Sequence, residues 1–118
     1  MDFQRRVKKW MAACFPPGAA DNANERTHRF LEEALELAQA NGCSRDDALA
    51  LVNYVFARPT GNAALEAGGV LVTLAGLCSA TDIDLEAAGE AELARNWDRI
   101  DAIRAKRAAR PENSPLPQ

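Results

Sequence analysis

Apolar residues recur every three or four positions through most of this chain, which is the spacing of amphipathic helices. In the first such segment Phe3, Val7 and Trp10 share one face. Asp2 can cap this segment, and the run Pro16-Pro17-Gly18 ends it. The sequence shows no period-two strand pattern, no internal repeat and no glycine-rich phosphate loop. We therefore predict an all-α protein, an antiparallel bundle of about five helices.

The second predicted helix contains HRFLEEALELAQ, residues 28–39, and ends at Asn41-Gly42, a left-handed C-terminal signal. Its candidate N-caps are Asp21, Asn22 and Asn24. A short third helix over residues 48–56 follows the hydroxyl cap Ser44 and ends before the chain-breaking run Arg58-Pro59-Thr60-Gly61.

The fourth predicted helix, residues 63–80, is apolar on nearly every side, which is typical of a buried central element. The fifth begins at Leu85 after the cap Asp84 and ends before Pro111. We expect residues 1–110 to form a single domain and residues 111–118, PENSPLPQ, to be a disordered tail.

Composition adds an expectation of self-association. Much of the apolar content of this 118-residue chain is alanine, which contributes little buried area per residue. A homo-oligomer, dimer or tetramer, is therefore expected. The net charge of -3 argues against a nucleic-acid partner. The basic residues Arg104, Lys106, Arg107 and Arg110 suit a solvated helix end, with a phosphate-binding patch as the alternative.

The cysteines and the hydropathy of the chain indicate the cellular compartment in which we expect the protein. Cys14, Cys43 and Cys78 are odd in number and include no Cys-x-x-Cys pair, so neither a disulfide framework nor a thiolate zinc site is expected. No segment reaches the roughly 20 apolar residues that cross a bilayer, and the N-terminus does not resemble a leader. We expect a cytoplasmic protein without a membrane partner.

Three carboxylates, Glu32, Glu33 and Glu36, fall on one arc of the second helix, opposite a broad apolar arc. Acidic residues on any solvated surface helix show the same pattern, and this simpler interpretation stays open. If the three charges were partly buried, their mutual repulsion would favour a bound cation. Glu66, at the start of the fourth helix, suits either a metal site or the helix dipole.

The fourth helix also carries a strip of small residues, Gly69, Thr73 and Gly76. Glycine inside a helix costs about 1 kcal/mol relative to alanine. We therefore expect a packed helix or a ligand to approach this strip closely.

These segments carry a family resemblance. FLEEALELAQ and, after a short connecting helix, LEAGGVLVTLAGLCSATDIDLEAAGEAELARN resemble the MazG-like branch of the all-α nucleoside triphosphate pyrophosphatases, over roughly residues 25–110. In that family a Glu-x-x-Glu and a Glu-x-x-Asp motif on two helices bind magnesium. Glu33 and Glu36 match the first motif, with Glu32 as an extra acid.

The second motif is matched only in part, because Glu66 is present and Gly69 stands where the family has aspartate. Either Glu32, Glu33, Glu36 and Glu66 suffice as metal ligands, or the site has lost its activity. Asp82 is a more distant candidate for the missing ligand.

The resemblance implies hydrolysis of a nucleoside triphosphate to the monophosphate and pyrophosphate, with Mg²⁺ as cofactor and Mn²⁺ as a substitute. It implies that Glu33 and Glu36 are catalytic and that Arg95 and Asn96 contact phosphate or sugar. The Glu-x-Gly-Gly-Val form resembles small bacteriophage-encoded members, which implies dGTP or GTP as substrate and a host cytoplasm as location. The alternative is a non-catalytic helical interaction protein with a degenerate metal site.

Overall fold

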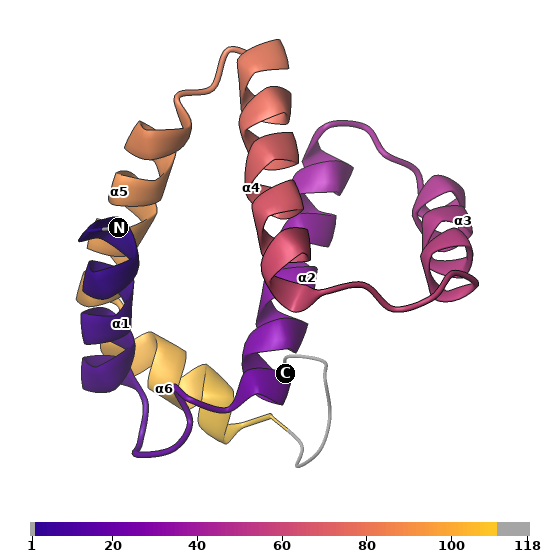
Figure 1. The fold of residues 1–118 in the computed structure, drawn as a ribbon. Helices are drawn as coiled ribbons and strands as arrows, with labels where there is room; N and C mark the ends of the chain where they lie inside the picture. Colours follow the sequence, from indigo (N-terminus) through magenta and orange to yellow (C-terminus); the bar gives the residue numbers. More distant parts are fainter. Residues whose placement is uncertain (1, 111–118) are drawn as a thin grey trace. The chain divides into compact units, whose positions relative to one another are not determined.

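The computed structural model describes residues 2–110, and in this range the chain forms six helices and no strand (Figure 1). The helices are α1 (Asp2–Cys14), α2 (Ala23–Ala40), α3 (Arg45–Phe56), α4 (Ala63–Ala80), α5 (Leu85–Asp98) and α6 (Ile100–Ala108). The all-α prediction is confirmed, with one helix more than expected. The predicted disordered tail, residues 111–118, lies outside the described residues.

Side-chain caps explain where four of these helices begin. Oxygens of Asn22, Ser44, Asn62 and Asp84 each accept a hydrogen bond from the backbone N–H three residues later, at 3.0 to 3.1 Å. These bonds satisfy N–H groups that have no partner inside the helix. Among the three candidate caps of α2, Asn22 is the one that bonds to the helix.

Left-handed residues end α2 and α4. Gly42 has φ 86° and Asp82 has φ 57°, and the N–H that follows each donates to a carbonyl five positions back, at 3.0 and 2.9 Å. This is the pattern of a helix C-cap, in which glycine is common and a short polar residue is tolerated. Asp82 therefore has a local role as a helix terminator.

The chain divides into two compact units, which are described separately. The first consists of Met1–Glu32 with Gly89–Gln118, and the second of Glu33–Ala88. The first thus contains α1, the beginning of α2, most of α5, and α6, and the second contains the rest of α2, α3, α4 and the start of α5. The expectation of a single domain over residues 1–110 stays a prediction.

A small core holds the first unit together. Trp10 and Cys14 of α1 pack with Leu93 of α5, and all three are buried. The ring of Phe15 meets that of Trp10 edge-on, with centroids 5.6 Å apart. Partly buried side chains surround this cluster: Phe3, Val7, Met11, Phe15, Ile100 and Ile103.

The helix predicted to run on from Leu85 is interrupted at Arg99, whose backbone (φ -112°, ψ 20°) is not helical. α6 therefore starts in a new direction, and its residues Ile100 and Ile103 reach the Trp10 core. The periodicity of the sequence continues across the break, so it gives no sign of this turn.

Two arginines form hydrogen bonds and ion pairs that link α1 to α5 and α6 of its unit. Arg104 of α6 donates to the backbone oxygens of Ala13 and Cys14, at 2.6 and 2.7 Å. It thereby supplies a cation to the C-terminal turn of α1, which has no basic residue of its own. Arg6 of α1 forms a bidentate ion pair with Glu90 of α5.

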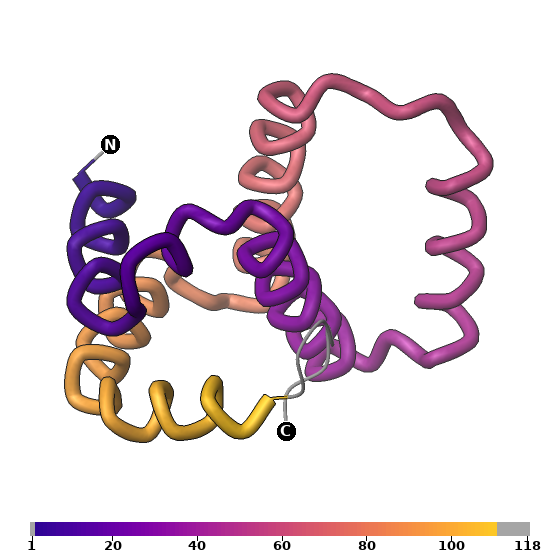
Figure 2. Tube along the Cα trace, turned by 90° about the horizontal axis from the view of Figure 1, so that it is seen from below, coloured from indigo at the N-terminus to yellow at the C-terminus, as the bar shows by residue number. Residues whose placement is uncertain are grey.

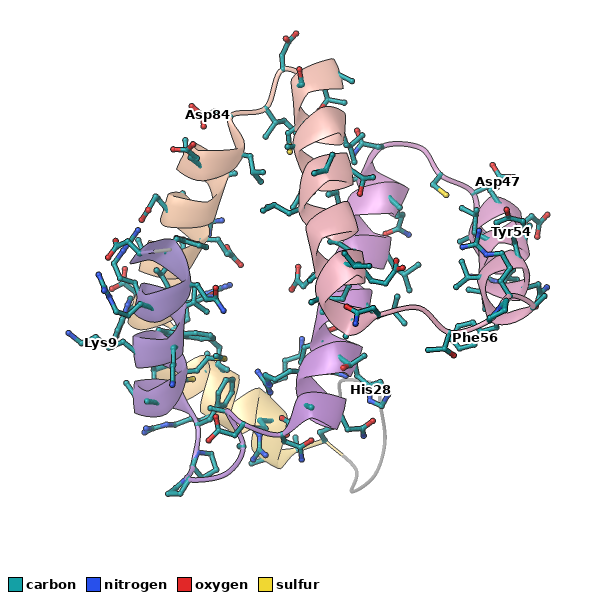
Figure 3. The ribbon with its side chains drawn as sticks, viewed as in Figure 1. Lys9, His28, Asp47, Tyr54, Phe56 and Asp84 are labelled. Atoms are coloured by element: carbon teal, nitrogen blue, oxygen red, sulfur yellow. The ribbon has the colours of Figure 1, made fainter. Side chains whose placement is uncertain are left out.

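The second unit leaves most of its apolar side chains exposed. In α4, Leu65 is 76% exposed and Val72 is 72% exposed, and Cys78 is its buried residue. In α3, Phe56, labelled in Figure 3, is 84% exposed. Figure 2 shows that extended segments connect α3 to α2 and to α4. Within the second unit α4 is therefore not buried, contrary to the prediction, because an apolar pattern shows that a helix needs covering without showing what covers it.

Leu93→Ala tests the importance of the Trp10 core. Removing a buried leucine side chain should lower the free energy of unfolding by about 2–4 kcal/mol, measured by urea denaturation. The matched control is Ala94→Ser, at the neighbouring exposed position, which should cost less than about 0.7 kcal/mol. Equal effects of the two substitutions would contradict this account of the core.

Candidate functional site

The acidic residues of α2 lie in a continuous helix, as predicted. Glu33 and Glu36 are exposed, and their spacing of three residues puts their Cβ atoms roughly 5–6 Å apart on one face. Glu32 is half-buried, and its carboxylate lies 3.7 Å from the guanidinium of Arg29. The Glu33 and Glu36 pair is therefore the accessible part of the acidic face.

Glu66 occupies the first turn of α4 and is exposed. Its carboxylate folds back over the loop before the helix, where a Cβ at position 61 would lie 2.7 Å from Glu66 Oε1. A larger residue at position 61 would displace the end of the Glu66 side chain, which is flexible and exposed and can move at little cost.

The predicted metal ligands do not form a closed site. Within residues 2–110, no group of three His, Cys, Asp or Glu side chains comes close enough together to hold an ion. Carboxylate oxygens are nevertheless the ligands that Mg²⁺ prefers. The described residues offer ligands of the right kind without gathering three of them.

The small-residue strip of α4 faces open space. A Cβ at Gly69 or Gly76 would meet no side chain or neighbouring backbone within 4 Å. Thr73 turns its hydroxyl to the helix itself, donating to the carbonyl oxygens of Gly69 and Val70 at 2.9 and 3.1 Å. The close neighbour that the strip predicts is therefore absent from the second unit.

Arg95 and Asn96 lie near the end of α5, in the first unit. Arg95 donates to Glu92 Oε1 through Nε at 2.9 Å, and Asn96 Oδ1 accepts from Arg99 at 2.9 Å. Both side chains thus have partners one turn away on the surface of the helix. A substrate would have to replace these bonds.

An arginine cluster surrounds Glu25, and the sequence analysis found only its part near the C-terminal end, Arg107 and Arg110. Arg107 donates to both oxygens of Glu25, at 3.0 and 3.1 Å. Arg26 lies 3.0 Å and Arg110 3.7 Å from the same carboxylate. Arg29 stands one turn beyond Arg26 on α2.

The interpretation of this basic segment as a solvated helix end is wrong for Arg107 and Arg110. Arg107 bonds to Glu25, and the Arg110 side chain is only 15% exposed. Arg104 and Lys106 are both exposed, although Arg104 also bonds to the end of α1. The spacing of three residues between Arg26 and Arg29, repeated between Arg107 and Arg110, was a signal for this cluster.

Charge and burial shift the pKa values in this cluster. The hydrogen bonds from Arg107 lower the pKa of the Glu25 carboxyl. Partial burial lowers the pKa of Arg26 and of Arg110. The Nε atoms of Arg26 and Arg110 are buried and have no hydrogen-bond partner among the described residues.

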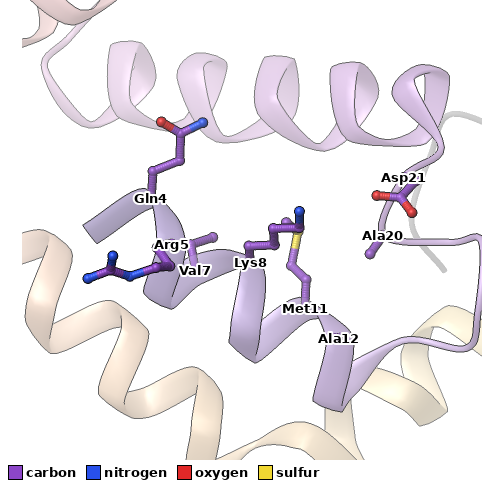
Figure 4. Close-up of a pocket in the computed structure, with 8 residues that line it drawn as sticks. All are labelled: Gln4, Arg5, Val7, Lys8, Met11, Ala12, Ala20 and Asp21. Carbon is purple, nitrogen blue, oxygen red and sulfur yellow. The ribbon is translucent and has the colours of Figure 1, made fainter. Parts of the chain in front are cut away.

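Two hollows lie elsewhere. In the first unit a groove of about 510 Å³ runs along α1, where Val7, Lys8 and Met11 line it and Asp21 closes one end (Figure 4). In the second unit a shallow hollow of about 750 Å³ is lined by residues that include Asp47 and Tyr54, labelled in Figure 3. Neither hollow is lined by the predicted metal ligands.

In comparisons with protein-family models, curated proteins and solved structures, nothing matches this chain. The family resemblance of its motifs is therefore a hypothesis about function, and the geometry of the residues has to support it.

Glu25→Gln tests the ion pair at the centre of the arginine cluster. Because the Glu25 pKa is lowered in the folded state, its contribution is present above the unfolded pKa of about 4.3 and is lost as the pH falls through the folded value. The substitution should therefore lower the free energy of unfolding by about 1–3 kcal/mol at pH 7 and much less in acid.

Urea denaturation of the wild type and Glu25→Gln at several pH values measures this difference. Glu86→Gln, at an exposed position of α5, is the control and should change stability little at any pH. A Glu25→Gln effect that stays constant down to pH 3 would show that the carboxylate charge contributes nothing.

Proposed function

We propose that this protein is a metal-dependent nucleoside triphosphate pyrophosphohydrolase that cleaves its substrate to the monophosphate and pyrophosphate. The observation that carries the proposal is the exposed carboxylate pair Glu33 and Glu36, one turn apart on α2, within the FLEEALELAQ segment. A continuous helix through these residues is what a Glu-x-x-Glu metal motif requires, because it puts both carboxylates on one face.

Mg²⁺ is the proposed cofactor, with Mn²⁺ as a substitute. Glu33 and Glu36 would hold the ion together with Glu32 and Glu66. When bound, Mg²⁺ neutralises phosphate charge and lowers the pKa of coordinated water. The proposal requires Glu66, which belongs to the same unit as Glu33 and Glu36, to approach them on metal binding.

The proposed substrate is dGTP or GTP, which rests on the resemblance to small bacteriophage-encoded members of the family. Arg95 and Asn96 are proposed to contact phosphate or sugar. The guanidinium of Arg95 is exposed, and its present partner Glu92 is also accessible, so an exchange of partners costs little.

The direct test is pyrophosphate release from eight ribo- and deoxyribonucleoside triphosphates, with magnesium, with manganese and with a chelator. Release that requires metal, with dGTP or GTP cleaved fastest, is the expected result. Absence of release from every substrate under every condition would refute the hydrolase proposal.

Glu36→Gln tests the assignment of the catalytic residues. It should reduce pyrophosphate release to background because it removes a charged oxygen from the proposed metal site. The far-UV circular dichroism and melting temperature should be retained, since the position is exposed. The control Glu86→Gln removes an exposed carboxylate of α5 and should keep wild-type turnover. Full turnover of Glu36→Gln would exclude this residue.

A second candidate function is a non-catalytic interaction protein. It is favoured by Gly69 in the second motif and by the absence of a three-ligand cluster in residues 2–110. On this hypothesis Glu33→Gln and Glu36→Gln leave manganese binding unchanged, because the wild type binds none. Manganese titration by calorimetry or electron paramagnetic resonance therefore separates the two candidates.

We also propose that the protein is a homo-oligomer, dimer or tetramer, that associates through α3 and α4. Their ten exposed large apolar residues are Leu49, Leu51, Val52, Tyr54, Val55, Phe56, Leu65, Val70, Leu71 and Val72. At about 1 kcal/mol for covering each half-exposed side chain, their burial is worth on the order of 10 kcal/mol. That equals the whole stability of a typical domain, so an uncovered state is unfavourable.

A second copy of the chain suits this surface better than a membrane does. α4 is long and apolar enough to cross a membrane by length and composition, with a mean hydropathy of 1.6 over 18 residues. However, residues 59–94 contain six acidic residues and no Lys, Arg or His. Membrane helices are favoured by flanking cations and membrane surfaces are anionic, so this segment suits a cytoplasmic oligomer.

The open strip at Gly69 and Gly76 supports helix packing between copies, because missing side chains let two backbones approach closely. A twofold axis beside α4 would pair the strip with itself. The close packing between copies would then offset the unfavourable helix propensity of the glycines.

Val72→Glu tests the oligomer. Light scattering after size exclusion should show a dimer or tetramer for the wild type and a smaller species for the variant, because a buried unpaired charge opposes association. Ala94→Glu, at an exposed position of α5 outside this surface, should keep the wild-type mass. A monomeric wild type would refute association through α3 and α4.

A further inference from the structure

Among residues 2–110, four arginines of the first unit lie around two carboxylates. Arg26, Arg29, Arg107 and Arg110 bring four cations to one place, and the acceptors that they contact are Glu25 and Glu32. The arginines also act on one another, since Arg29 and Arg107 both contribute to lowering the pKa of Arg26 and of Arg110.

These guanidinium groups are partly buried yet reachable. Side-chain exposure is 24% for Arg26, 18% for Arg29, 15% for Arg110 and 32% for Arg107. A guanidinium removed from water needs acceptor oxygens for its N–H groups. The buried Nε atoms of Arg26 and Arg110 have no such acceptor within residues 2–110.

The four arginines do not have the same structural task. Arg107 occupies both oxygens of Glu25, and Arg26 stacks on the ring of Phe15, with its guanidinium carbon 4.6 Å from the centroid. Both therefore help to hold α2 and α6 to their unit. Arg110 lies 3.7 Å from Glu25, a longer ion pair than those of Arg26 and Arg107 with the same carboxylate. Replacing Arg110 should therefore disturb the fold less than replacing Arg26 or Arg107.

We propose that the arginine cluster, Arg26, Arg29, Arg107 and Arg110, binds a phosphate-class oxyanion. Planar guanidinium groups donate pairs of hydrogen bonds to phosphate oxygens, and they tolerate partial burial better than ammonium groups do. The anion provides acceptors for the buried Nε atoms of Arg26 and Arg110. Its assignment to the triphosphate chain of a nucleotide, rather than to free phosphate or pyrophosphate, rests on the proposed function.

The experiment is calorimetric titration of the full chain in chelator, so that no metal contributes. The probes are inorganic phosphate, pyrophosphate, tripolyphosphate, dGTP and deoxyguanosine. Tripolyphosphate and dGTP are expected to bind with similar affinity and deoxyguanosine not at all. Arg110→Gln should weaken tripolyphosphate binding about tenfold or more, because a charge-assisted hydrogen bond is lost.

Arg5→Gln is the matched control. Its guanidinium belongs to the same unit, is 78% exposed and pairs with Asp2 of its own helix. This variant should bind tripolyphosphate like the wild type. The melting temperature of Arg110→Gln should stay within a few degrees of the wild type, which separates loss of binding from loss of fold. Arg29→Gln provides a second variant in which the same loss of affinity is expected.

Four outcomes decide the proposal. Arg110-dependent binding of tripolyphosphate and dGTP supports a triphosphate site. Arg110-dependent binding of inorganic phosphate alone supports the anion site and assigns it to free phosphate. Binding of no oxyanion, or binding unchanged in both variants, overturns the proposal and leaves an ion-pair network. Because the titration contains no metal, intact binding without pyrophosphate release would refute the hydrolase and not the anion site.

Discussion

The described residues bury only five apolar side chains, and this shortage is the constraint on which the rest of the structure depends. Three of the five, Trp10, Cys14 and Leu93, form one cluster, so the first unit has a centre. Hydrogen bonds from two arginines then connect further parts of the unit to this cluster. Arg104 donates to a backbone oxygen at the end of α1, and Arg107 donates to the carboxylate of Glu25. The second unit has no comparable cluster in the described range, and the exposed apolar surface of α3 and α4 is the result.

Local interactions made the helices predictable. A cap such as Ser44 or Asp84, and a left-handed stop such as Gly42, act within one turn, so the residues alone reveal them. The interruption at Arg99 was not predictable in this way, because no proline, glycine or side-chain cap marks it. Its physical reason is tertiary, since the break brings Ile100 and Ile103 to the core.

The same distinction between local and tertiary interactions applies to the candidate site. The helical pattern put Glu33 and Glu36 on one face, and the structure agrees. Whether Glu66 joins them depends on packing between helices, which periodicity does not encode. The complete arginine cluster was missed for a related reason, because each arginine by itself resembles a solvated side chain. Only the contact between α2 and α6 through Glu25 shows that these charges share one place.

The two units leave different kinds of groups unsatisfied, so different ligands should raise the free energy of unfolding of each unit. Among the described residues, the first unit offers no acceptor to the Nε atoms of Arg26 and Arg110, and the second unit does not cover α4. Anything that binds only the folded chain adds stability, by about 2.7 kcal/mol when its concentration is a hundred times its dissociation constant. An oxyanion and a second copy would each act in this way, through different helices. The free energy of unfolding should therefore rise with phosphate and with protein concentration independently, because an arginine cluster and an apolar surface are satisfied by different ligands.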